Sequence, residues 1–275
     1  MNCRVETFGK VVKGFDERKR KLVTEMGFGG LLFLSGKSLP RTFYYWLCTR
    51  VDVNNKVLLM LDGLEFPLSK TRVYWVLGIP AGPKTVPLYG DDADEGGDEV
   101  MRFLDVYGYT SRSGVRGIKA SVIKQNVEGE ISSDAEFKKA FLMMTLNDLI
   151  CPMTCQRMSV SLLYAVVVAE RPHEYDWCSL LLDHLIIAIG GFAKRFCRDG
   201  FAKGCGRCTM FLAILYLDRL RRPPLMWGRF SKDTGMVYCR CEQGEEGRFA
   251  GTWRLRQARG VYILNLYCLL GYPCV

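Results

Sequence analysis

Residues 175–196 read YDWCSLLLDHLIIAIGGFAKRF, and residues 207–221 read RCTMFLAILYLDRLR. Both stretches are apolar almost all the way around a helix, which is typical of helices at the centre of a protein. They predict a mainly α protein whose second part, residues 100–230, is a helical bundle. The residues that we expect to lie deepest in its core are Trp177, Leu181, Ile186, Phe211 and Leu215.

Residues 1–90 predict an N-terminal helical module with one small β-hairpin, at 56–68. The sequences VLLML (57–61) and LEFPL (64–68) flank Asp62-Gly63, a pair that favours a two-residue hairpin turn. Pro67 has no N–H to donate to a sheet ladder, which favours an edge strand.

Helices are predicted on both sides of this hairpin and throughout the bundle. Ser69 or Thr71 can cap one of them, and Gly78 followed by Pro80 would end it. The residues Ser132-Ser133-Asp134 can cap another, which begins at 135. The predicted helices span 40–50, 72–77, 135–150, 156–169, 175–196 and 207–221.

An acidic run, DDADEGGDE at 91–99, separates the module from the bundle. Its like charges repel and its glycines add freedom, so we interpret it as an extended linker. Beyond the bundle, residues 231–275 form a tail that is first basic and then apolar, with no pattern that defines its structure.

The positive charge of the chain is confined to one region. The 275 residues carry 38 basic and 29 acidic side chains, a net charge of +9, yet residues 1–193 hold 23 of each. The 15 basic and six acidic side chains of 194–259 therefore account for the whole excess, and 12 of those 15 are arginine. Such a segment points to an anionic partner.

Within this segment, arginines alternate with aromatic residues in a way that suits phosphate contact and base stacking. A solvated basic face or a protein-binding surface would look similar. We therefore expect either a nucleic acid or a protein partner there. The candidate binding residues are Arg219, Arg221, Arg222, Trp227, Arg229, Arg254 and Arg256.

Five of the 12 cysteines raise the question of a zinc site: Cys197, Cys205, Cys208, Cys239 and Cys241. Cys205 and Cys208 have the spacing of half a zinc site, and the other three are near enough in sequence to complete it. However, Cys208 opens a strongly apolar helix and the second pair is CxC. Structural thiols are the favoured interpretation, so no metal is predicted.

The sequence offers no set of residues for catalysis. A nucleophilic cysteine needs a histidine partner, and the two histidines, His173 and His184, lie in a loop and in an apolar helix without a cysteine signature. The glycines at 27–30 lack the lysine of a phosphate-binding loop. We predict a protein that is not an enzyme and binds no cofactor.

The N-terminal residues contain basic side chains, including the run 18–21, rather than an apolar secretory signal. The longest apolar runs fall short of the roughly 20 residues that cross a bilayer. We therefore expect a protein inside the cell and away from membranes, in the nucleus if 18–21 acts as an import patch and otherwise in the cytoplasm.

Several short motifs resemble one family, the plant mobile domain. In the N-terminal part they are GFGGLL (27–32), Leu39-Pro40, Trp46-Leu47 and LGIP (77–80) with Gly82. Later matches are LICP (149–152), Asp176-Trp177, Gly204-Cys205 and LYLDR (215–219). Together they span roughly residues 25–230. Asp176 occupies a position at which the resemblance leads us to expect asparagine.

The resemblance implies a mostly helical protein derived from a transposon. Members are often labelled aminotransferase-like, and related regions sometimes precede a SUMO-specific cysteine protease domain. This chain shows neither the Schiff-base lysine context nor the protease constellation that those activities require. The expected function is a nuclear module that binds protein or nucleic acid; the alternative is the N-terminal regulatory part of such a protease-like transposon protein.

Overall fold

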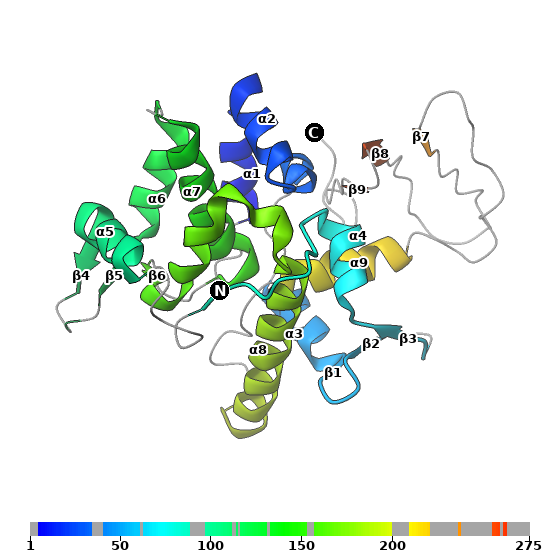
Figure 1. Cartoon of the computed structure of the whole chain (residues 1–275). Helices are drawn as coiled ribbons and strands as arrows, with labels where there is room; N and C mark the ends of the chain where they lie inside the picture. Colours follow the sequence, from blue (N-terminus) through cyan, green and yellow to red (C-terminus); the bar gives the residue numbers. More distant parts are fainter. Residues whose placement is uncertain are drawn as a thin grey trace, which may run out of the picture.

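In the computed structural model of the chain, the described residues are 5–34, 41–60, 63–88, 97–111, 114, 116–130, 133–152, 157–199, 209–220, 236–237, 255–258 and 261–262. Helices dominate them, which confirms the mainly α class (Figure 1). The α-helices are α1 (Val5–Lys13), α2 (Glu17–Glu25), α3 (Arg41–Thr49), α4 (Lys70–Leu77), α5 (Gly97–Tyr107), α6 (Ala120–Glu128), α7 (Asp134–Thr145), α8 (Trp177–Asp199) and α9 (Thr209–Leu220).

Three small antiparallel sheets replace the single hairpin that the sequence predicts. The first has the order β1 (Val51–Asp52), β2 (Val57–Leu59), β3 (Glu65–Pro67), and the second β4 (Gly108–Thr110), β5 (Arg116–Lys119), β6 (Arg157–Ser159). The third has the order β7 (Met236–Val237), β8 (Leu255–Ala258), β9 (Val261–Tyr262), so the described part of the tail 231–275 contains strands.

The predicted hairpin exists, as β2 and β3, but its turn is longer than predicted. Met60 donates its N–H to the carbonyl of Leu64, and Gly63 donates to the carbonyl of Met60. Strand β2 ends at Leu59 and β3 begins at Glu65, and Gly63 between them has a φ of 80°. Pro67 lies in β3, at the sheet edge, as predicted.

The acidic run 91–99 is not a linker over its full length, since residues 97–99 form the first turn of α5. Asp98 and Glu99 favour this turn because carboxylates stabilise the positive end of a helix dipole. Glu99 also forms an ion pair with Lys139 of α7, with 2.5 Å between Oε1 and Nζ. Residues 91–96 lie outside the described residues.

The helix predicted at 156–169 is wrong. Residues 157–159 pair with β5 as strand β6, and two 3₁₀ helices follow, Val160–Leu162 (η3) and Tyr164–Glu170 (η4). The side chain of Ser159 accepts a hydrogen bond from the N–H of Ser161, which favours a local turn over a continuous α-helix. The helix predicted at 135–150 is α7 followed by a π-helical turn, Leu146–Ile150 (η2).

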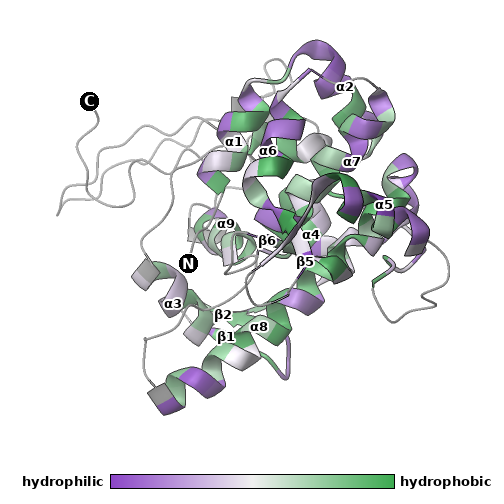
Figure 2. Cartoon of the chain, turned by 90° about the vertical axis from the view of Figure 1, so that its left-hand side faces the viewer, coloured by the Kyte–Doolittle hydropathy of each residue, from purple (hydrophilic) through white to green (hydrophobic). Residues whose placement is uncertain are grey.

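One hydrophobic cluster joins the two parts that the sequence separates at the acidic run. Phe28, in the N-terminal part, packs edge-on against Phe141 of α7 at 6.2 Å and against Trp177 of α8 at 5.7 Å between ring centroids. The five predicted core residues are all buried, Trp177, Leu181 and Phe211 completely. Figure 2 shows the hydrophilic ribbon of α2 on the outside and apolar ribbon along α8 and β2.

Helix α8 is longer than the apolar runs counted in the sequence. By length and composition, its residues Trp177–Arg198 could cross a membrane, but 44% of the apolar window is buried inside the protein. A core helix passes the same test. One end of α8 extends from the body (Figure 1). Ile187 of α8 is 72% exposed.

Candidate nucleic-acid interface

Helix α4 is central to the candidate interface, and its own sequence sets its limits. The side chain of Ser69 accepts a hydrogen bond from the N–H of Arg72, and Gly78 ends the helix in the left-handed conformation at a φ of 60°. The sequence left Ser69 and Thr71 as alternative caps, and the structure has Ser69; the end at Gly78 was predicted. Val73 and Leu77, four residues apart, are buried and fix the face that points inward. The side chain of Trp75, on the opposite face, is exposed.

The segment after α4 is held by a second segment about 90 residues away. We call residues 78–84 and 172–178 together the joint. Gly82 donates its N–H to the carbonyl of Tyr175 at 3.0 Å, and Lys84 donates its N–H to the carbonyl of Glu174 at 3.0 Å. A side chain at Gly82 would lie 2.2 Å from the backbone of Glu174, so the joint requires glycine there.

Trp177 closes the joint from the side of α8. Its indole Nε1–H donates to the carbonyl of Pro172 at 2.7 Å, and its backbone N–H donates to the carbonyl of Pro80 at 3.1 Å. Gly30 packs so closely on the end of α4 that a Cβ would lie 2.3 Å from the carbonyl oxygen of Leu77. The motifs around Gly30, Leu77 and Trp177, on which the family resemblance rests, thus meet in space and share a packing role.

Asp176 begins α8 within the same joint. Its carboxylate accepts hydrogen bonds from the N–H and the hydroxyl of Ser179, at 2.9 and 2.8 Å, and pairs with Lys70 of α4 at 3.3 Å. Burial raises the pKa of this carboxyl, but the bonds from Ser179 and Lys70 outweigh it, so the pKa is lowered overall. Asp176 therefore caps the N-terminus of α8, as asparagine would, and its charge also allows the ion pair with Lys70 of α4.

Two neighbours bring predicted binding residues to α4. Helix α9 packs against α4, and Arg219 lies in its last turn. Strand β9 also lies against α4, and its partner β8 contains Arg256 (Figure 1). Two of the seven predicted binding residues thus lie on elements around one helix. Arg221, Arg222, Trp227, Arg229 and Arg254 lie outside the described residues.

The exposed face of α4 is a feature that the sequence analysis missed. Tyr74 and Trp75 are 49% and 58% exposed, and Arg72 lies over the ring of Phe66 of β3 at 4.6 Å. The spacing of the helix could have predicted this exposure: because Val73 and Leu77 point inward, position 75 must point outward.

The cysteines give no support to a metal site within the described residues, where no group of three or more potential ligands occurs. Cys197 is exposed in α8, and the other four zinc candidates lie outside the described residues. Cys178 is buried and its thiol donates to the carbonyl of Ile79 at 3.4 Å. Burial, together with the charge of Asp176, raises its pKa to about 12, so it remains a thiol at neutral pH.

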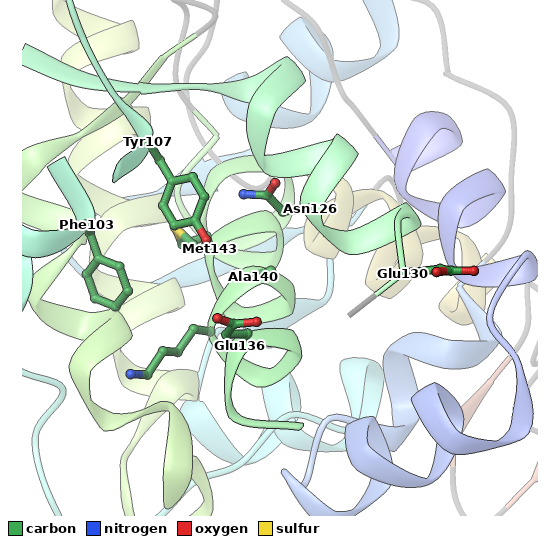
Figure 3. A pocket seen from close by; sticks show the side chains of 8 residues that line it. Phe103, Tyr107, Asn126, Glu130, Glu136, Ala140 and Met143 are labelled. Carbon is green, nitrogen blue, oxygen red and sulfur yellow. The ribbon is translucent and has the colours of Figure 1, made fainter. Parts of the chain in front are cut away.

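A pocket of about 250 Å³ lies between α5, α6 and α7 (Figure 3). Phe103 and Tyr107 line it together with Glu136 and Lys139, and Lys139 is engaged by Glu99. Its lining includes neither histidine nor cysteine. The pocket can hold a small polar group, but it brings together no nucleophile and base.

These features define a mainly α protein in which two of the seven predicted binding residues lie on α9, which contacts α4, and on β8, whose partner β9 contacts α4. Residues 1–213 match the family DUF8566, a domain of unknown function, and because the match covers more than half of the chain, the chain belongs to that family. Helix α4 and the joint lie inside the matched residues. No curated protein and no solved structure matches the chain.

Proposed function

We propose that this protein is a module derived from a mobile element that binds nucleic acid in the nucleus and catalyses no reaction. One observation carries the proposal: the whole excess of +9 lies in 194–259, while residues 1–193 hold equal numbers of basic and acidic side chains. Arginine-rich segments neutralise phosphates and release the counterions around them.

Several charges of the body pair with one another, and residues 1–193 carry no net charge, so the arginine-rich segment is the region that favours an anionic partner. Ion pairs join elements far apart in sequence, such as Arg18 of α2 with Asp134 of α7, and Lys138 of α7 with Glu170 of η4. The plant mobile domain resemblance supports a mobile-element origin. The nuclear location rests on the basic composition of 18–21, although these side chains also make contacts within the fold, such as that of Lys19 with the carbonyls of residues 127–129.

The proposal is tested by fluorescence anisotropy with a labelled 20-nucleotide DNA or RNA. Affinity should fall steeply with added salt, with a slope of about 0.7 per phosphate contacted on a single strand. The double variant Arg221→Glu/Arg222→Glu should bind more weakly and with a shallower slope. Both residues follow α9 and precede Pro223-Pro224, so the change should leave the core intact.

A matched control reverses two charges in the body. Lys10→Glu/Lys13→Glu, at the end of α1, changes the net charge by the same amount and should bind like the wild type. Absence of salt-sensitive binding by the wild type, or equal binding by both double variants, would refute the nucleic-acid function. A protein partner with an acidic face would then be the better explanation.

A further inference from the structure

We infer that the outward face of α4 is a stacking platform for the unpaired bases of a single-stranded nucleic acid. We define the platform as Phe66, Arg72, Tyr74 and Trp75. This inference rests on the proposed function and specifies its ligand as single-stranded rather than duplex.

The first support is the exposure and arrangement of two neighbouring rings. Tyr74 and Trp75 are 49% and 58% exposed, although large aromatic side chains are normally covered. Their ring centroids lie 6.1 Å apart and the rings are nearly perpendicular, at 79°. Each ring can therefore offer a face to a separate base.

The second support is a cation on the same helix, held against Phe66 of β3. The guanidinium of Arg72 lies 4.6 Å from the ring centroid of Phe66. Among the described residues it makes no ion pair, whereas Lys70, two positions earlier, is paired with Asp176. A planar cation held flat on an aromatic ring can itself stack on a base or contact a phosphate.

The third support is the position of the platform within the molecule. Helix α4 contacts both α9, which contains Arg219, and β9, the partner of the strand that contains Arg256. Single-strand binding uses a stacking surface and positive charge for the backbone. The rings on α4 would supply the first, and the arginine-rich segment 194–259, which includes α9 and β8, would supply the second.

A single strand fits this arrangement better than a duplex. Bases in a duplex are stacked on one another, and their faces are closed to protein rings. Single-strand binding by stacking tolerates any sequence, because every base has a π face. We therefore expect binding with little sequence preference.

The test uses the full chain with labelled dT20, rU20 and a 20-base-pair duplex. Trp75→Ala should weaken binding to the single strands by about ten-fold or more, which is the range of one lost base stack. The salt slope should stay unchanged, because no phosphate contact is removed. Comparing dT20 with rU20 distinguishes DNA from RNA as the ligand.

Two further variants separate stacking from simple damage. Trp75→Phe keeps an aromatic face and should retain most of the affinity, but it should remove part of the quenching of tryptophan fluorescence that binding causes. Tyr109→Ala is the matched control: Tyr109 is 40% exposed on β4, with the Lys119 amine 4.0 Å from its ring centroid, and it lies on another sheet. It should bind like the wild type.

Equal binding of dT20 and rU20 by Trp75→Ala and the wild type would overturn the platform and leave the proposed function standing. Tighter binding of the duplex than of either strand, or equal losses in Trp75→Ala and Tyr109→Ala, would overturn it as well. If the wild type binds no nucleic acid at low salt, the proposed function itself fails and the platform with it.

Discussion

Two tryptophans near the joint have opposite surroundings: Trp177 lies in the joint at the start of α8, and Trp75 lies on α4, just before the joint. Trp177 is fully buried in the joint, with both of its N–H groups donated to carbonyls. Trp75 is 58% exposed on α4, the helix that leads into the joint. The comparison shows that α4 is held in place by its buried side, while Trp75 on its other side stays exposed.

Replacing Trp177 by alanine tests the buried side of this comparison with the largest effect. Trp177→Ala should lower the free energy of unfolding by about 3–5 kcal/mol, since it opens a cavity and removes the indole N–H that donates to the carbonyl of Pro172. Urea denaturation measures the change. A loss below about 1 kcal/mol would show that the joint is not a fixed part of the core.

A side chain added at Gly82 of the joint should have the next largest effect on the free energy of unfolding. Gly82→Ala should lower the free energy of unfolding by about 1–3 kcal/mol, because the new methyl group meets the backbone of Glu174, which cannot move aside easily. Gly97→Ala, at the start of α5 where nothing lies within 4 Å of the added carbon, is the control. Similar losses in both variants would contradict the close approach at Gly82.

Asp176 adds a pH dependence to the joint. Its pKa in the folded protein is lowered from the usual 3.8, so its contribution to stability is fully present above that value and is lost as the pH falls through the folded pKa. At pH 7, Asp176→Asn should cost about 1 kcal/mol by removing the charge at the start of α8 and the pair with Lys70. Urea denaturation at pH 7 and at about pH 3 should show this difference shrink as the pH falls toward the lowered pKa of Asp176. A difference that stays constant would show that it comes from packing.

The smallest effect is expected on the exposed side. Trp75→Ala should change the free energy of unfolding by no more than about 0.5 kcal/mol, as for most surface substitutions. The same urea measurement, run beside that of Trp177→Ala, gives the contrast directly. A loss of 2 kcal/mol or more would place Trp75 in the core and remove the basis for a binding face on α4.

Local signals in the sequence predicted most of the helices. Ser69 and Ser133 cap α4 and α7, and Gly78 ends α4 in the left-handed conformation. These features depend only on neighbouring residues, so they are readable from the sequence. The apolar stretches of α8 and α9 likewise predicted a buried centre correctly.

Features that depend on distant partners were not predictable in this way. Residues 157–159 form a strand because they pair with the backbone of β5, some 40 residues earlier. Helix α5 begins inside the acidic run, and its first turn is stabilised by the ion pair between Glu99 and Lys139 of α7, a separate helix. The exposed pair Tyr74–Trp75 resembles a core motif in composition, and only the direction of Val73 and Leu77 shows that it faces outward.

The joint also has a consequence for how the chain folds. Lys84 and Glu174 are 90 positions apart, so their segments can meet only after a long loop has closed. Such non-local contacts form slowly and tend to be completed late on the folding pathway. Interactions formed after the transition state govern the rate of unfolding more than the rate of folding. The glycines and the tryptophan of the joint therefore set how long the native protein persists once it is formed.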